Sequence, residues 1–194
     1  MSNEKIINIK VLLLGDIGVG KTTLCQKLNT GDFIYEHRST IGVDFLTYLH
    51  KCNTPLGNYN YKLQFWDTTG QDKFYSLISC YFRRSNIILI MFDLSNNDSY
   101  KNILKWYSCI SNYMIDNMTI ILIGNKNDLS INADLTKINE FCIEHHIKMI
   151  NISIKKDRDF NKLMDMICSN YNELPNEQQM IITHTHKYAC CNIS

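Results

Sequence analysis

The chain has 194 residues, of which 45% are hydrophobic and only two are proline, so we expect one compact domain whose core needs no covalent cross-links. The 20 basic and 19 acidic residues leave a net charge of +1, which excludes a strong overall attraction to nucleic acid or to anionic lipid. No secretory signal pattern opens the chain, and no apolar run approaches the roughly 20 residues of a spanning helix, so a cytosolic protein is expected.

The eight cysteines lack the C-x-x-C spacing of metal sites, and six of them are dispersed singly through apolar segments. In a reducing compartment these six are expected to be small core residues rather than disulfide partners. They are Cys25, Cys52, Cys80, Cys109, Cys142 and Cys168.

Short β-branched runs alternate with longer amphipathic ones, which predicts an α/β fold with a six-stranded, mostly parallel sheet and about five flanking helices. Turn-forming residues at 53–58 predict a loose hairpin, so the strands on either side should be antiparallel. The strands are expected at residues 6–14, 43–51, 59–66, 87–92, 119–123 and 148–152. The helices are expected to begin at Lys21, near Ser76, at Ser99, near Asp134 and near Asp159.

A glycine-rich segment follows the first apolar strand. The run from Gly15 to Thr22 matches G-x-x-x-x-G-K-[ST], in which backbone N–H groups cradle phosphate at the start of a helix. Lys21 would bridge the outer phosphates, and the Thr22 hydroxyl would coordinate Mg²⁺. The alternative is a glycine-rich turn that binds nothing, which the preceding strand makes less favoured.

Two further segments carry polar groups at strand ends. Asp67 follows an alternating strand and can hold Mg²⁺ through water, while Gly70 can offer an N–H group to a terminal phosphate. Asn125 to Asp128 follow an apolar strand. A carboxylate at Asp128 can accept hydrogen bonds from N1–H and the 2-amino group of guanine, and adenine has neither donor.

At this point the chain resembles the Rab family of Ras-like small GTPases. Asn125-Lys126-Asn127-Asp128 is similar to the family's guanine motif, and Ser153-Ile154-Lys155 to its last guanine element, with Ile154 in place of alanine. Residues 38–45 resemble the first switch, and residues 62–67, 81–84 and 99–106 resemble further Rab segments. The likeness spans roughly residues 5–171.

The resemblance implies a P-loop small GTPase fold with a GTP-binding domain at residues 1–174, Mg²⁺ as cofactor, and GTP or GDP as the bound nucleotide. Catalysis would involve Gln71, Lys21, Thr40 and Gly70, with Gln71 orienting the attacking water. The metal would be held by Thr22, Thr40 and Asp67. The nucleotide would be bound by Gly15, Ile17, Gly18, Val19, Gly20, Lys21, Thr22, Thr23, Phe33, Thr40, Gly70, Asn125, Lys126, Asp128, Ser153, Ile154 and Lys155.

Two positions depart from the family. Ile17 stands where the family has a small residue, and Thr69 stands where it has alanine. Larger side chains at either place slow hydrolysis in this family, so we hypothesise slow turnover and a long-lived GTP form. Ordinary turnover with an adjusted backbone is the alternative, and a catalytically silent scaffold that binds guanine nucleotide is another. A nucleoside kinase would need an arginine-rich lid, which the sequence does not contain.

The resemblance also implies partners. Phe45, Trp66 and Tyr81 match an aromatic triad that Rab proteins present to effectors, although ordinary packing is the simpler interpretation. Effectors, exchange factors and GTPase-activating proteins are expected as partners of a monomeric switch in vesicle trafficking, and nucleic acid is not.

The segment 175–194 is expected to be a flexible tail, and Cys190-Cys191 near its end resembles the double-cysteine endings of Rab proteins. Two prenyl groups there would hold the protein stably on the cytosolic face of intracellular membranes. Prenylation of Cys191 alone, as in a C-a-a-X motif, and two idle thiols are the alternatives.

Overall fold

The computed structural model describes residues 6–34, 40, 42–54, 57–70, 80–111, 113 and 118–172. Six strands form one sheet in the order β2-β3-β1-β4-β5-β6. The strands are β1 (Ile6–Leu14), β2 (Val43–Thr54), β3 (Gly57–Thr68), β4 (Ile87–Asp93), β5 (Thr119–Asn125) and β6 (Lys148–Asn151). The helices are α1 (Lys21–Thr30), α3 (Asn97–Lys101), α4 (Ile103–Ser111), α5 (Leu135–Glu144) and α6 (Asp157–Asn172).

All strand pairs are parallel except β2 with β3, which are antiparallel, as predicted. The ladder between these two continues to Thr54 opposite Gly57, so the hairpin is tighter than the loose turn expected over 53–58. Both strands are also longer than expected. The ladder hydrogen bonds of an antiparallel pair satisfy backbone groups up to the turn, which favours this extension over an open loop.

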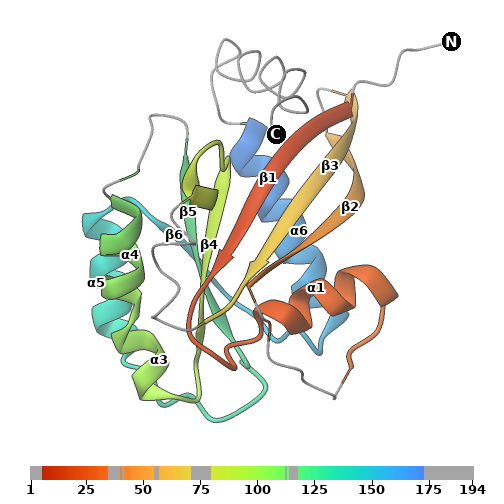
Figure 1. The fold of residues 1–194 in the computed structure, drawn as a ribbon. Coiled ribbons are helices and arrows are strands. Elements are labelled where there is room, and N and C mark those ends of the chain that lie inside the picture. The colour runs from red at the N-terminus through yellow and green to blue at the C-terminus, as the bar shows by residue number, and fades with distance from the viewer. Residues whose placement is uncertain are drawn as a thin grey trace, which may run out of the picture.

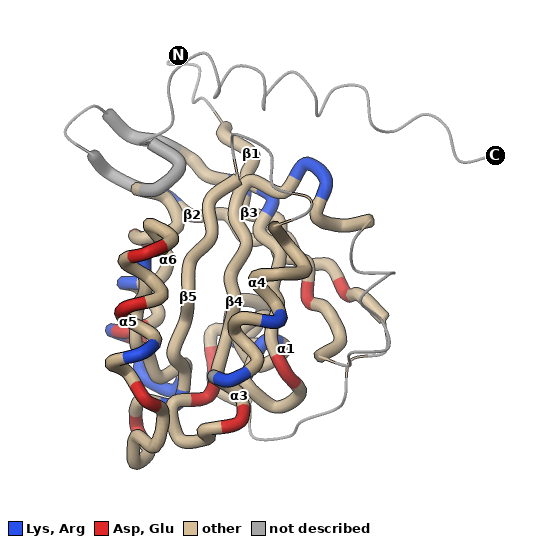
Figure 2. Tube along the Cα trace, turned by 90° about the vertical axis from the view of Figure 1, so that its left-hand side faces the viewer, with Lys and Arg blue, Asp and Glu red and all other residues tan. Residues whose placement is uncertain are grey.

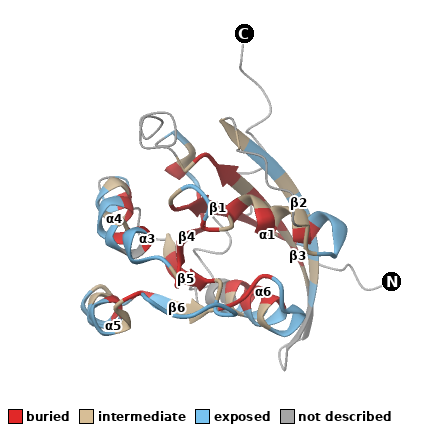
Figure 3. Cartoon of the chain, turned by 90° about the horizontal axis from the view of Figure 1, so that it is seen from below, coloured by how far each residue is buried: buried red, intermediate tan, exposed pale blue. Residues whose placement is uncertain are grey.

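The sheet separates two apolar cores (Figures 1 and 3). Helices α1 and α6 cover one face, and α3, α4 and α5 cover the other. In the central strand β1, Ile9, Val11 and Leu13 belong to the first core, whereas Leu12 and Leu14 belong to the second. A parallel strand covered by helices on both faces must be apolar on both, which is why β1 and β4 are nearly continuous hydrophobic runs.

The helix expected from Ser99 is two helices in the structure. Ser99 Oγ donates to the carbonyl oxygen of Asp93, at 3.0 Å, and accepts from the Asp93 N–H, at 2.8 Å. Asn102 lies between α3 and α4, and its side chain donates to the carbonyl oxygen of Asp98 at 3.2 Å. Side chains that bond to nearby backbone compete with helical hydrogen bonds, which explains the break.

The apolar stripe expected in this region is confirmed, since Ile103, Trp106 and Ile110 are buried in α4. Helix α5 begins after Asp134, which accepts a hydrogen bond from the Lys137 N–H as an N-cap. The helix start predicted near Ser76 lies outside the described residues, and Cys80 to Phe82 are helical.

The cysteine prediction is only partly correct. Cys142 and Cys168 are buried, and Cys25 and Cys109 are partly buried, but Cys80 is exposed. Cys80 lies in the helical residues 80–82 rather than in an apolar strand, and the Cys52 side chain lies outside the described part of the structure. Acidic and basic residues lie interspersed over the described part of the chain in Figure 2. Within the described part of the chain, no helix is long and apolar enough to cross a bilayer.

Candidate functional site

A cavity of about 530 Å³ lies at the carboxyl ends of the parallel strands, where β1, β3, β5 and β6 all end. Open α/β sheets bind ligands at this edge. Most residues predicted to contact nucleotide line the cavity, and Thr68, Thr69 and Leu129 join them. The lining residues are Ile17, Gly18, Gly20, Lys21, Thr22, Thr23, Phe33, Thr40, Thr68, Thr69, Gly70, Asn125, Lys126, Asp128, Leu129, Ser153, Ile154 and Lys155.

The loop from Gly15 to Gly20 connects β1 to α1 and forms the floor of the cavity. Gly15 and Gly20 have φ values of 135° and 109°, and a Cβ at Gly15 would collide with the carbonyl oxygen of Met91. Lys21 is buried, and its Nζ donates to the carbonyl oxygens of Gly15 at 2.7 Å and Asp16 at 2.8 Å. The loop therefore curls around an ammonium group at the start of a helix, as phosphate binding requires.

Burial lowers the pKa of Lys21 to about 8, and the nearby carboxylates of Asp67 and Asp16 oppose this effect. A phosphate group in the cavity would supply the negative charge that this buried ammonium lacks.

Gly15 and Val19 were predicted to contact nucleotide but are not among the lining residues. Val19 is buried in the first core, and its carbonyl oxygen accepts from Asn125 Nδ2 at 2.9 Å. Gly15 and Val19 therefore contribute to the conformation of the phosphate loop rather than to the cavity wall.

Three oxygen-bearing side chains converge beside Lys21. Thr22 Oγ1 donates to Asp67 Oδ2 at 2.7 Å, Thr40 Oγ1 donates to the same atom at 3.3 Å, and the two hydroxyl oxygens lie 2.7 Å apart. The other carboxylate oxygen of Asp67, Oδ1, is buried and has no hydrogen-bond partner among the described residues. Burial raises the pKa of Asp67, although the two threonine hydrogen bonds and the charge of Lys21 oppose the shift.

A buried carboxylate with a free oxygen beside two hydroxyls is a suitable donor set for Mg²⁺, which prefers hard oxygen ligands. The residues therefore fit the metal predicted for this site. Thr22, Thr40 and Asp67 would hold it, and it would supply positive charge that neutralises phosphate oxygens.

The far end of the cavity is built by the segments after β5 and β6. Ser153 Oγ donates to Asp128 Oδ1 at 2.6 Å, and Lys155 Nζ lies 3.5 Å from Asp128 Oδ2. The Ser153 hydrogen bond lowers the pKa of Asp128 below its usual range. Asp128 is therefore a fixed acceptor at the position predicted to contact guanine.

Lys126 and Phe33 complete this end. Lys126 lines the cavity, but its ammonium group pairs with Asp93: Lys126 Nζ lies 2.6 Å from Asp93 Oδ2. The Lys155 ammonium lies 5.4 Å from the centre of the Phe33 ring. The ring that was expected to stack on a base therefore lies at the cavity beside the Lys155 ammonium.

Ile17 and Thr69, the two departures from the family, both line the cavity. The Ile17 side chain is 65% exposed, whereas Thr69 is buried and its N–H donates to the carbonyl oxygen of Gly42 at 3.0 Å. Gly70 lies so close to the phosphate loop that a Cβ there would collide with the Asp16–Ile17 peptide. The chain after β3 and the phosphate loop are therefore in direct contact at this point.

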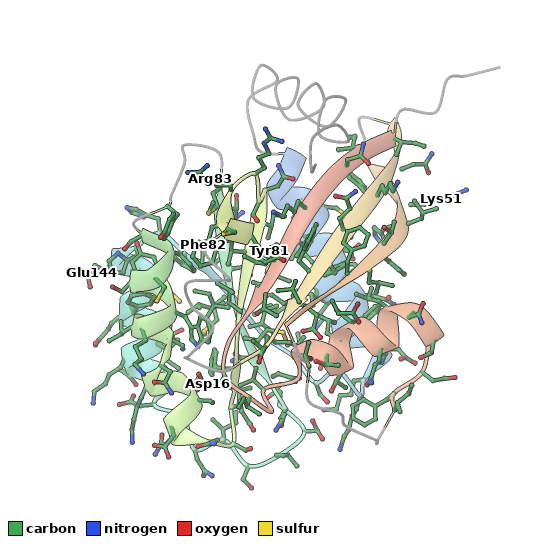
Figure 4. The ribbon with its side chains drawn as sticks, in the orientation of Figure 1. Asp16, Lys51, Tyr81, Phe82, Arg83 and Glu144 are labelled. Carbon is green, nitrogen blue, oxygen red and sulfur yellow. The ribbon has the colours of Figure 1, made fainter. Side chains whose placement is uncertain are left out.

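Two polar contacts behind the phosphate loop were not predicted. Asp16, which Figure 4 labels at the lower end of the sheet, accepts from Trp106 Nε1 at 3.0 Å and from Asn102 Nδ2 at 2.9 Å. The sequence analysis assigned Trp106 only to the apolar face of its helix. Its partner lies 90 positions away, so helical spacing carried no signal for this bond.

The aromatic triad forms a cluster close to the strand end that carries Asp67, because Trp66 directly precedes Asp67 in β3 and pairs with Phe45 near the start of β2. The ring of Trp66 lies 5.1 Å from that of Phe45 and 5.2 Å from that of Tyr81. Lys10 Nζ lies 5.0 Å from the centre of the Trp66 ring and donates to the carbonyl oxygens of Tyr81 and Arg83. Phe45 is 49% exposed, whereas Trp66 and Tyr81 pack partly against the second core. The cluster thus combines packing with an accessible aromatic surface.

Three of the predicted functional residues, Gln71, Cys190 and Cys191, lie outside the described residues, as do residues 38, 39 and 41 of the predicted first switch. Their roles stay predictions.

The model of the Ras family matches residues 10–173 of this chain. The chain is 32% identical to the Ras-related protein Rab-32D of Dictyostelium discoideum over 182 residues, which cover 88% of this chain and 78% of that protein. It is 36% identical to the Ras-related protein Rab-1D of the same organism over 159 residues, or 80% and 75% of the two chains. It is 40% identical to RABD2a of Arabidopsis thaliana over 133 residues, or 68% and 63%. The chain belongs to the Ras family as a Rab-like small GTPase, and its activity is the hydrolysis of GTP.

Proposed function

We propose that this GTPase is a switch in intracellular vesicle trafficking that binds effectors when it carries GTP and releases them when it carries GDP. One observation supports this best: a single cavity is lined by a buried lysine, by Thr22 and Thr40, whose hydroxyls donate to the adjacent Asp67 carboxylate, and by Asp128, a fixed acceptor for guanine. The γ-phosphate and the metal would hold Thr40 and Gly70, and hydrolysis would release both segments.

Identification of the nucleotide that co-purifies with the chain tests this proposal. Chromatography after denaturation should find GDP or GTP in a ratio near one per chain. Replacement of Asp128 by asparagine should lower the affinity for guanine nucleotides, because the new side chain no longer presents two acceptor oxygens. A preference for ATP over GTP would contradict the proposal.

Effectors are proposed to bind the aromatic cluster of Phe45, Trp66 and Tyr81. Phe45 contributes exposed apolar surface, and the Trp66 indole N–H is buried with no partner in the described part of the chain. An interface centred on aromatic anchors obtains most of its binding energy from a few such residues. Phe45→Ala should weaken capture of GTP-state partners without changing the nucleotide affinity.

Slow hydrolysis is the third part of the proposal. The exposed Ile17 side chain stands at the cavity, beside the contact between Gly70 and the phosphate loop. An arginine brought by an activating protein, and the water oriented by Gln71, would have to share this volume. Single-turnover hydrolysis should therefore be faster in Ile17→Ser and in Thr69→Ala than in the unmodified chain. If neither variant is faster, hydrolysis is not limited by these side chains.

The family membership favours this hydrolysing switch over the silent scaffold. We further propose that prenyl groups on Cys190 and Cys191 attach a monomeric protein to the cytosolic face of intracellular membranes. Intact-mass measurement of the chain produced in cells with prenylating enzymes would distinguish two additions from one or none.

A further inference from the structure

Lys27 lies in the middle of α1 and is buried, with only 3% of its side chain exposed. Its ammonium group has three partners. Nζ donates to the carbonyl oxygen of Ile154 at 2.7 Å, lies 2.8 Å from Asp157 Oδ1, and lies 5.5 Å from the centre of the Phe160 ring. An ammonium group is costly to bury, so contacts of this number and quality are needed to keep it in the apolar core.

The Ile154 peptide is held at both ends. Its N–H donates to Asn125 Oδ1 at 3.2 Å, and its carbonyl oxygen accepts from Lys27. Asn125 in turn donates to the carbonyl oxygen of Val19 in the phosphate loop. One chain of buried hydrogen bonds thus links the phosphate loop, Asn125, Ile154 and α1.

Ser153 precedes Ile154, and its hydroxyl orients Asp128 through the 2.6 Å hydrogen bond. Its own N–H donates to Asp159 Oδ2 at the start of α6, at 3.0 Å. The direction of the Asp128 carboxylate therefore depends on where the Ser153–Ile154 segment lies. Lys27 is 127 positions from Ile154 in sequence and fixes that segment from behind.

We propose that Lys27 is a positioning residue for guanine recognition: by holding the Ile154 carbonyl it fixes Ser153, and through Ser153 it orients the Asp128 carboxylate that accepts from the base. This inference rests on the proposed guanine site. Lys27 does not line the cavity, so it acts on the nucleotide only through this loop.

The test compares release of GDP and of inosine diphosphate, which lacks the 2-amino group that Asp128 would bind. Both dissociation rates are measured on the full chain by displacement of ribose-labelled fluorescent nucleotides. Lys27→Met keeps the length of the side chain and removes the donor. We expect it to speed GDP release about tenfold or more, because misplacement of the Asp128 carboxylate weakens its hydrogen bonds to the base, and one hydrogen bond to a charged group contributes about 1.5–3 kcal/mol, which corresponds to at least that factor. Release of inosine diphosphate should change less, so the preference for GDP falls.

Two variants control for the change of charge and of packing. Lys27→Arg retains donors for the carbonyl and the carboxylate and should restore the preference. Lys162→Met removes an exposed lysine of α6 and should leave both rates unchanged. Melting temperatures are recorded for all variants. If Lys27→Met lowers the melting temperature but keeps the unmodified preference, Lys27 is only structural and the inference is wrong.

The preference is a ratio of two rates on one preparation, so inactive protein does not affect it. If Lys27→Met cannot be purified, Asp157→Asn tests how the Lys27 ammonium is held, because Asp157 Oδ1 lies 2.8 Å from Lys27 Nζ. The Asp157 side chain is 87% exposed, so the fold should tolerate this change. This variant should lower the preference by a smaller factor, and an unchanged preference would contradict the inference. Asp128→Asn distinguishes a failure of the proposed guanine site from a failure of the proposed role of Lys27. If it too leaves the preference unchanged, the proposed guanine site is wrong; if it alone lowers the preference, only the role of Lys27 fails.

Discussion

Replacement of Asn125 by alanine should destabilise the folded chain more than any exposed substitution. The Asn125 side chain is buried and makes two hydrogen bonds, a donation to Val19 O at 2.9 Å and an acceptance from Ile154 N at 3.2 Å. Alanine would leave a buried carbonyl and a buried N–H without their partners. Each unsatisfied group costs about 1–3 kcal/mol, so the free energy of unfolding should fall by about 2–6 kcal/mol.

Urea denaturation of the nucleotide-free protein measures this loss, because bound nucleotide would add its own stabilisation. Asn132→Ala is a matched control, since Asn132 is exposed and donates one bond to the Ser95 carbonyl at 2.8 Å. The control should change the free energy of unfolding by about 0.5 kcal/mol or less. A loss below about 1 kcal/mol for Asn125→Ala would refute the reasoning, because it would mean that water or a shifted backbone satisfies both groups at little cost.

Three further predictions concern the same cavity. Burial lowers the pKa of Lys21 from 10.5 to about 8 in the folded chain, so between these values the unfolded chain binds more protons and the free energy of unfolding should rise with pH. Burial lowers the pKa of Lys10 to about 8 as well, so nucleotide-free Lys21→Met should keep a smaller slope, and a slope equal to that of the unmodified chain would contradict the contribution of Lys21. EDTA removes Mg²⁺, so it should accelerate GDP release from the unmodified chain, and Asp67→Asn should reduce this acceleration about tenfold or more. A loss of this size is typical when an outer partner of a metal site is removed. An undiminished response to EDTA would exclude Asp67 from the metal site. Trp106→Phe should lower the free energy of unfolding, measured with urea, by about 1–2 kcal/mol, because Asp16 loses the buried indole N–H donor. Leu104→Ala changes an exposed position and should leave the free energy of unfolding nearly unchanged. Equal effects of the two variants would mean that the indole hydrogen bond contributes nothing.

The parts of the site that depend on local sequence were predictable. The phosphate loop, Asp67 and the guanine segment each lie at the end of an apolar strand. Once the parallel strands were predicted, these three segments were therefore expected at the same edge of the sheet. The helix break at Asn102 was not predicted, because it depends on Ser99 and Asn102 bonding to backbone that the apolar stripe does not report.

Contacts between distant segments were also beyond prediction. Nothing in the local sequence distinguishes Lys27 from an exposed lysine of a helix. Its side chain is buried because α6 packs beside α1, with Asp157 and Phe160 against the Lys27 ammonium. Trp106 was correctly placed in the core, but the direction of its N–H toward Asp16 depends on how α4 meets the phosphate loop. Such contacts require the assembled fold.

The order of segments around the cavity has a consequence for synthesis of the chain. The phosphate loop and Thr22 leave the ribosome early, whereas Ser153, Ile154 and the helix that pairs with Lys27 emerge near the end of the described domain. A nascent chain that stops before residue 153 has the phosphate loop and Asp128 but lacks the Ser153 hydroxyl that orients the Asp128 carboxylate. Tight retention of the ligand therefore begins only after nearly the whole domain has been translated.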